Sequence, residues 1–174
     1  QVVAAVTVAK AELISGNKVQ RLTISEMVET LGSKPKTIEN RIRAGIIEGK
    51  SVDQMVRDIM RIADKVNKRD ARTIVRTAFN LAGSEARRAV NEANADVLIG
   101  ERLVVTLDSR TSATCYGLGS KNEIYKIGEG PQPPLHFGCR TVRVGIVDPR
   151  YAVPGIKGLK SARGDSGVEQ IDTD

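Results

Sequence analysis

A chain of 174 residues is long enough for one hydrophobic core with a helical appendage. Hydrophobic residues make up 40% of it, aromatic residues only 3%, and tryptophan is absent, which argues against a site that stacks sugars or nucleobases. The net charge of +6 is compatible with an acidic partner, and two cysteines are too few for a disulfide-dense secreted scaffold.

The chain opens on Gln1 rather than methionine, and we therefore expect it to come from inside a longer precursor or to have lost its start. The apolar run at residues 2–9 is too short to span a bilayer and lacks the basic leader of a secretory signal. We expect this run to form a helix or strand packed against another segment, and we expect no membrane partner.

Three helices are predicted before residue 69. Thr23 and Glu26 have the spacing of a capping box, and the helix that they begin should end at Gly32. Pro35 suits the first turn of a second helix, and Ser51 begins a third. Apolar residues recur at helical spacing and give each helix one buried face: Ile24, Met27, Val28 and Leu31; Ile38, Ile42 and Ile46; Val52, Met55, Val56, Ile59, Ile62, Ala63 and Val66.

A long helix is predicted to begin at Asp70. Apolar, mostly small residues recur along it at steps of three and four, and they form a narrow seam. Such a seam lets another helix approach closely, either from the same chain or from a second copy in a homo-oligomer. The seam residues are Val75, Phe79, Ala82, Ala86, Ala89 and Ala93.

Positive charge is concentrated between Arg61 and Arg88. This segment holds eight positive and three negative residues, and so it carries +5 of the net charge. Many basic faces are merely solvated, but a cluster this uneven is also compatible with an acidic partner such as double-stranded DNA. The candidate DNA-binding residues are Lys65, Lys68, Arg69, Arg72, Arg76, Arg87 and Arg88.

After Gly100 the pattern changes to short β-branched runs between turns rich in glycine and proline. Runs at residues 103–107, 124–127 and 141–147 predict a small, mainly antiparallel sheet. The expected fold class is therefore α+β. It comprises a helical N-terminal region at residues 1–69, a long helix with a small β domain at 70–148, and an extended or disordered tail at 149–174.

The only histidine of the chain lies three residues before one of its two cysteines. His136 and Cys139 could point at one ion, with Cys115 as a third ligand and Asp108 as a fourth. Such a structural zinc ion would hold together a sheet that has little core of its own. Three alternatives stay open: a disulfide, two free buried thiols, and a histidine that only hydrogen-bonds within the proline-rich turn.

Cys115 and His136 are also the residue types of a nucleophile and its base. The sequence indicates neither a helix N-terminus nor an oxyanion loop beside Cys115. A cysteine-dependent hydrolase is therefore the less favoured hypothesis, and we expect no enzymatic activity.

The order of these residues resembles the C-terminal domain of Mu F-like minor head proteins of tailed bacteriophages. The resemblance covers about residues 70–147 and rests on a helix opening Asp70-Ala-Arg-Thr and continuing through Ala78-Phe-Asn, a strand, Asp108-Ser-Arg-Thr, a cysteine, a glycine and Pro133-Pro-Leu-His-Phe-Gly-Cys-Arg. The family usually ends this motif Cys-Arg-Cys, whereas this chain has Thr141, which removes one thiolate from any zinc site. The positions that match the motif are Asp108, Arg110, Cys115, His136, Cys139 and Arg140.

The resemblance implies a structural protein of the capsid interior. Such proteins enter the assembling head in the host cytoplasm with the portal and with scaffold or capsid protein, can bind DNA, and assist packaging or ejection of the genome. It also implies an architectural network in which Asp108 pairs with an arginine and braces the turn. The residues of this structural motif are Asp108, Arg110, Thr111, Pro134 and Arg140.

Residues 23–51 allow a different interpretation, because two helices joined by a turn at Gly32 look like a helix-turn-helix. The chain would then be a DNA-binding regulator. Two consecutive amphipathic helices share the same periodicity, and this hypothesis leaves the pattern from Asp108 to Arg140 unexplained. The residues that would face the major groove are Lys36, Thr37, Asn40, Arg41 and Arg43.

Overall fold

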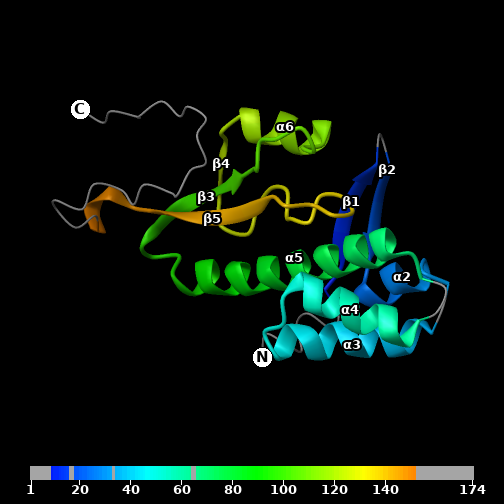
Figure 1. Cartoon of the computed structure of the whole chain (residues 1–174). Coiled ribbons are helices and arrows are strands. Elements are labelled where there is room, and N and C mark those ends of the chain that lie inside the picture. Colours follow the sequence, from blue (N-terminus) through cyan, green and yellow to red (C-terminus); the bar gives the residue numbers. More distant parts are fainter. Residues whose placement is uncertain (1–8, 16–17, 33, 64–65, 152–174) are drawn as a thin grey trace.

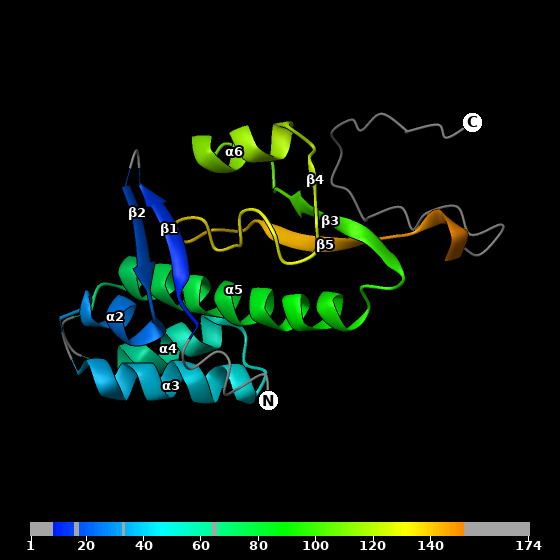
Figure 2. The same cartoon turned by 180° about the vertical axis from the view of Figure 1, so that it is seen from behind.

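The computed structural model describes residues 9–15, 18–32, 34–63 and 66–151. In it, the long helix α5 lies between a layer of shorter helices and a small sheet, with α6 beyond the sheet (Figures 1 and 2). This arrangement confirms the expected α+β class. The helices are α2 (Ile24–Glu29), α3 (Pro35–Ile47), α4 (Val52–Ile62), α5 (Lys68–Ala93) and α6 (Ala113–Ser120). The strands are β1 (Ala11–Ser15), β2 (Lys18–Leu22), β3 (Leu98–Val104), β4 (Ile124–Tyr125) and β5 (Val142–Val147).

The short helices begin where their capping residues predict. The Glu26 amide donates to Thr23 Oγ1, and the Glu26 carboxylate accepts from the Thr23 amide at 2.6 Å. Ser51 forms the same reciprocal cap at the start of α4, and Pro35 stands in the first turn of α3. These local bonds satisfy amides that a helix start leaves without partners.

The main core lies between the short helices and the first half of α5. Its fully buried residues include Ile24, Met27, Ile38, Ile42, Met55, Ile59, Val75, Ala78 and Leu81. The predicted domain boundary at residue 70 lies near the start of α5. Helix α5 shares the main core with the helices before that boundary. The predicted seam along α5 is divided, because Val75 and Ala82 are buried in this core whereas Phe79 is 45% exposed.

A β-hairpin precedes the helices, so the N-terminal region expected to be helical also contains two strands. Strand β1 pairs antiparallel with β2, and Ala11 and Leu13 of β1 are buried. The Ile14 amide donates to the Leu135 carbonyl at 2.7 Å, which joins the hairpin to the C-terminal half of the chain. Of the apolar run at residues 2–9, only Ala9 lies within the described residues, and it packs against the core.

The sheet is antiparallel, as expected, with β3 between β4 and β5. Strand β3 begins at Leu98, earlier than predicted, and β4 has only two residues. Beyond β5, Pro149–Tyr151 form a 3-10 turn, and the rest of the predicted tail lies outside the described residues. No helix in the described part of the chain is both long and apolar enough to cross a membrane.

A buried ion pair between β3 and β5 ties this sheet together. Arg143 Nη2 lies 2.8 Å from Glu101 Oε2, and the two side chains are 2% and 1% exposed. Arg143 also donates to the carbonyls of Pro131, Lys126 and Glu129 in the loop after β4. No pattern in the sequence predicted this network, which anchors the long loop to the sheet.

Candidate metal centre

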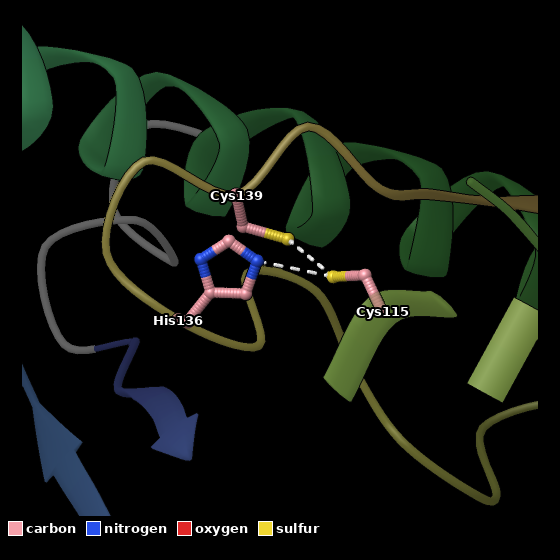
Figure 3. A group of neighbouring side chains, drawn as sticks. All are labelled: Cys115, His136 and Cys139. Carbon is pink, nitrogen blue, oxygen red and sulfur yellow. Dashed lines mark hydrogen bonds between the residues drawn. The ribbon is translucent and has the colours of Figure 1, made fainter. Parts of the chain in front are cut away.

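Three side chains from two separate segments meet between α6 and α5. Cys115 lies in the first turn of α6, while His136 and Cys139 lie in the loop between β4 and β5 (Figure 3). Cys115 Sγ is 3.1 Å from His136 Nε2 and 3.8 Å from Cys139 Sγ. The structure therefore brings together the three residues that the sequence singles out as metal ligands.

The spacing of these atoms fits a tetrahedral zinc ion. Zinc–sulfur bonds of about 2.3 Å place two sulfurs of a tetrahedral site about 3.8 Å apart. The two cysteine sulfurs have this separation, and the three candidate ligand atoms all lie within 4.8 Å of one another. The distance of 3.1 Å between Cys115 Sγ and His136 Nε2 is shorter than the roughly 3.5 Å of such a site, so the imidazole has to move outward by a few tenths of an ångström to admit an ion.

The imidazole of His136 is oriented for coordination through Nε2. Its Nδ1 lies 2.9 Å from the Phe137 carbonyl oxygen, which only accepts hydrogen bonds, so Nδ1 carries the proton that it donates. In the neutral ring Nε2 then keeps its lone pair and points toward the sulfurs (Figure 3). A backbone carbonyl on the distal nitrogen is a common way in which proteins orient a metal-binding histidine.

Helix α5 holds the loop that carries His136 and Cys139. Asn80 donates from its amide to the carbonyls of Cys139 at 2.9 Å and Thr141 at 3.1 Å. Gly138 adopts a φ of +71°, a conformation that favours glycine, and its amide donates to Thr77 Oγ1 at 2.8 Å. Asn80 stands in the sequence motif without an assigned role there, and no sequence pattern indicated the role of Thr77.

Without an ion, the pKa values of the two thiols shift in opposite directions. The hydrogen bond from Cys115 and the nearby His136 lower the pKa of Cys139, whereas the hydrogen bond with Cys139 and burial raise the pKa of Cys115. The Cys139 sulfur also raises the pKa of His136. Because two adjacent buried thiolates repel each other, loss of the proton from one sulfur opposes its loss from the other unless a cation lies between them.

Asp108 lies outside the cluster, and the expectation that it is a fourth ligand is not supported. Both of its carboxylate oxygens accept from Arg140, each at 2.6 Å. This bidentate pair, with the Arg110 amide, lowers the pKa of Asp108 well below its usual range. Thr111 accepts from the Asp108 amide and donates to the Thr106 carbonyl, so the expected bracing network forms around this turn. Pro134 is buried in the loop that follows.

The cluster borders a cavity of only about 20 Å³, lined in part by Cys115, His136, Thr141, Arg110 and Arg140. This volume admits about one water molecule, whereas sites for organic ligands usually measure several hundred Å³. This cavity therefore leaves no room for a substrate beside Cys115, whereas Cys139 also borders a larger groove along α5.

One feature of the structure supports the hydrolase hypothesis, and two features oppose it. Contrary to the expectation, Cys115 does stand at a helix N-terminus, where Ser112 caps α6 and accepts from the Cys115 amide at 3.2 Å. However, Cys115 is only 3% exposed, and the raised pKa of its thiol opposes nucleophilic attack. The geometry therefore favours coordination over catalysis.

The predicted DNA-binding residues divide into paired and unpaired groups. Arg72 pairs with Asp53 at 2.5 Å, and Arg88 pairs with both Glu85 and Glu92 at 2.8 Å. Lys65 lies outside the described residues, and Lys68 and Arg69 are exposed at the start of α5.

Arg76 and Arg87 differ from these paired arginines. They line a groove of about 250 Å³ along α5, next to Phe79 and Val142, and neither meets an acidic side chain among the described residues. Two guanidinium groups are therefore available there to an acidic partner.

The residues of the helix-turn-helix hypothesis lie on α3. Lys36, Thr37, Asn40 and Arg41 are exposed, whereas Arg43 is half-buried and pairs with Glu39 at 2.7 Å. The surface of α3 therefore offers four of the five proposed side chains to solvent. The helix before it, α2, has only six residues.

The helical layer, the small sheet and the Cys–His–Cys cluster define an α+β protein with a braced C-terminal unit. The family model for Phage Mu protein F like proteins matches residues 36–144, more than half of the chain. The chain belongs to this family, which makes it a bacteriophage protein of the structural head-morphogenesis class and a component of the virion. No curated protein and no solved structure matches the chain.

Proposed function

We propose that this chain is a minor head protein of the capsid interior, which joins the head during assembly in the host cytoplasm together with the portal and with scaffold or capsid protein. The observation that carries the proposal is the family match from α3 to β5, which includes the whole Cys–His–Cys cluster. A cavity that admits only about one water molecule supports a role without turnover. The protein would assist packaging or ejection of the genome.

Association with the portal is the direct test of this role. The tagged chain is co-expressed with the portal protein of the same phage, and a basic helical protein of equal net charge serves as the control. We expect the chain, and not the control, to co-purify with portal rings and to be found in assembled heads. Heads that lack the chain, together with free portal rings, would contradict the proposal.

A structural zinc ion held by Cys115, His136 and Cys139 is the second part of the proposal. The sulfur separation of 3.8 Å and the orientation of His136 Nε2 support it. The ion would supply a crosslink and no chemistry. It would fasten α6 to the loop that Asn80 and Thr77 hold against α5.

Contact with DNA should depend on Arg76 and Arg87 more than on the paired arginines. Replacing both with alanine removes two phosphate contacts, so the slope of log affinity against log salt should fall by roughly 2, with similar losses on all sequences. Gel shifts with random and genomic fragments at rising salt measure this. Arg72→Ala is the matched control, because Asp53 already neutralises Arg72.

The same gel shifts distinguish the head-protein hypothesis from the regulator hypothesis. A regulator should prefer one duplex by about 10³ or more, whereas a head protein should bind all fragments alike. An unchanged salt slope in the Arg76→Ala/Arg87→Ala variant would refute the assignment of the groove, whichever sequence preference is found.

A further inference from the structure

The Cys–His–Cys cluster provides only three of the four ligands that a zinc ion takes. Within the described ranges, no further histidine, cysteine or carboxylate belongs to this group. Asp108, the nearest acidic candidate in the sequence motif, has both oxygens engaged by Arg140. The fourth position therefore has to be filled by something other than an ionisable side chain of this part of the chain.

The small cavity lies where that fourth ligand would be. Cys115 and His136 both line it, so the cavity lies directly beside two of the three candidate ligands. Its volume of about 20 Å³ exceeds the 10–15 Å³ that one water molecule requires. The surroundings suit a bound water, because the hydroxyl oxygens of Thr111 and Ser112, which also line the cavity, can accept the hydrogen bonds that a metal-bound water donates.

Thr141 contacts the candidate ligand Cys115 and also lines the cavity. Its side chain is 1% exposed, and its hydroxyl donates to Cys115 Sγ at 3.1 Å. This hydroxyl stabilises negative charge on the sulfur, as hydrogen bonds to metal-bound thiolates do. Because Thr141 Oγ1 lies as close to Cys115 Sγ as His136 Nε2 does, a sulfur at position 141 would lie within reach of the ion.

We propose that the ion has a water molecule as its fourth ligand, held in the cavity beside Thr141 and exchangeable with solvent. This inference rests on the proposed zinc site and specifies its coordination. A site with two sulfurs, one nitrogen and one water would brace the loop and still keep one open position. The cavity limits that position to ligands about the size of water.

Cobalt substitution tests this coordination directly. In the Co(II)-loaded full chain, dissolved in water enriched in ¹⁷O, a bound water broadens the electron paramagnetic resonance signal of the metal. We expect broadening in the wild type and in Thr141→Val, which keeps the cavity and removes only the hydroxyl. We expect no broadening in Thr141→Cys, in which X-ray absorption should count three sulfur neighbours instead of two.

The outcomes separate the two proposals. A chain that binds neither zinc nor cobalt overturns the metal site itself, and with it the water ligand. A wild-type chain that binds one cobalt ion without ¹⁷O broadening keeps the metal site but overturns the water ligand. Broadening in Thr141→Val but not in the wild type would assign the position to the Thr141 oxygen, which does not exchange with solvent, and would also overturn the proposal. Circular dichroism of each variant verifies that its helices are folded.

Discussion

Removal of zinc is expected to loosen residues 98–147 while the helical layer stays folded. The small cluster in this part of the chain contains Cys115, Leu135 and Cys139, with Val105 and Leu118 packed against it, so two of its three buried members are proposed ligands. The larger core between the helices contains none of them. An ion present at a thousand times its dissociation constant contributes about 4 kcal/mol to stability, and a chelator removes that contribution.

Hydrogen exchange measures this loss residue by residue. Addition of a chelator should abolish protection of the Gly138 and Cys139 amides, while circular dichroism keeps the helical signal of α3 to α5. Cys139→Ser should show the same loss without a chelator. Tyr116→Ala is the matched control, because Tyr116 is the neighbour of Cys115 on α6 and is 60% exposed. Exchange rates that a chelator leaves unchanged would refute the bracing role.

Arg143→Ala is expected to lower the free energy of unfolding by about 3–5 kcal/mol. The substitution leaves the Glu101 carboxylate buried at 1% exposure without its cation, although the Asn91 amide and the Gly128 amide still donate to it. The loop carbonyls that accept from Arg143 lose their donor as well. Urea unfolding followed by circular dichroism gives the difference.

Two further variants isolate the cause. Arg21→Ala breaks an ion pair with Glu12 in which Arg21 is 69% exposed, and it should cost less than about 1 kcal/mol. The double variant Glu101→Leu/Arg143→Met should recover much of the stability, because it leaves no unpaired buried charge. If Arg143→Ala proved as mild as Arg21→Ala, the buried pair would not hold the sheet and loop together.

The helices were predictable because their signals are local. The capping boxes at Thr23 and Ser51 and the proline at position 35 need no tertiary information, and all stand where helices begin. Helix α6 was missed for the opposite reason. Its eight residues include two glycines and no amphipathic face, and it is held by packing, since a Cβ on Gly119 would lie 2.6 Å from Val105.

The hairpin of β1 and β2 has a recognisable turn signal in the sequence. Residues 16–17 are Gly-Asn, a two-residue connection typical of hairpins, between two short runs with apolar residues. Alternation in β1 places Ala11 and Leu13 on the buried side. We did not predict the hairpin, because the apolar run before it and the clearer helical patterns after it gave stronger signals.

Spacing predicted that His136 and Cys139 lie close together, because a step of three residues in a turn brings two side chains together. It allowed Cys115 as a third ligand but left a disulfide and two free thiols open. It left open whether Asp108 binds an ion or an arginine, since both need the same carboxylate. The pairing of Glu101 with Arg143 depends on the register of β3 against β5 and on the loop that covers them. No local pattern contains that information.

The metal content of the purified chain tests the central claim most directly. Elemental analysis of wild-type protein, expressed with zinc in the medium and purified without chelators, should give one zinc atom per chain, and the Cys115→Ser/Cys139→Ser variant should give none. A folded wild-type chain that carries no zinc and takes up none on titration would contradict the account of how its C-terminal half is held together.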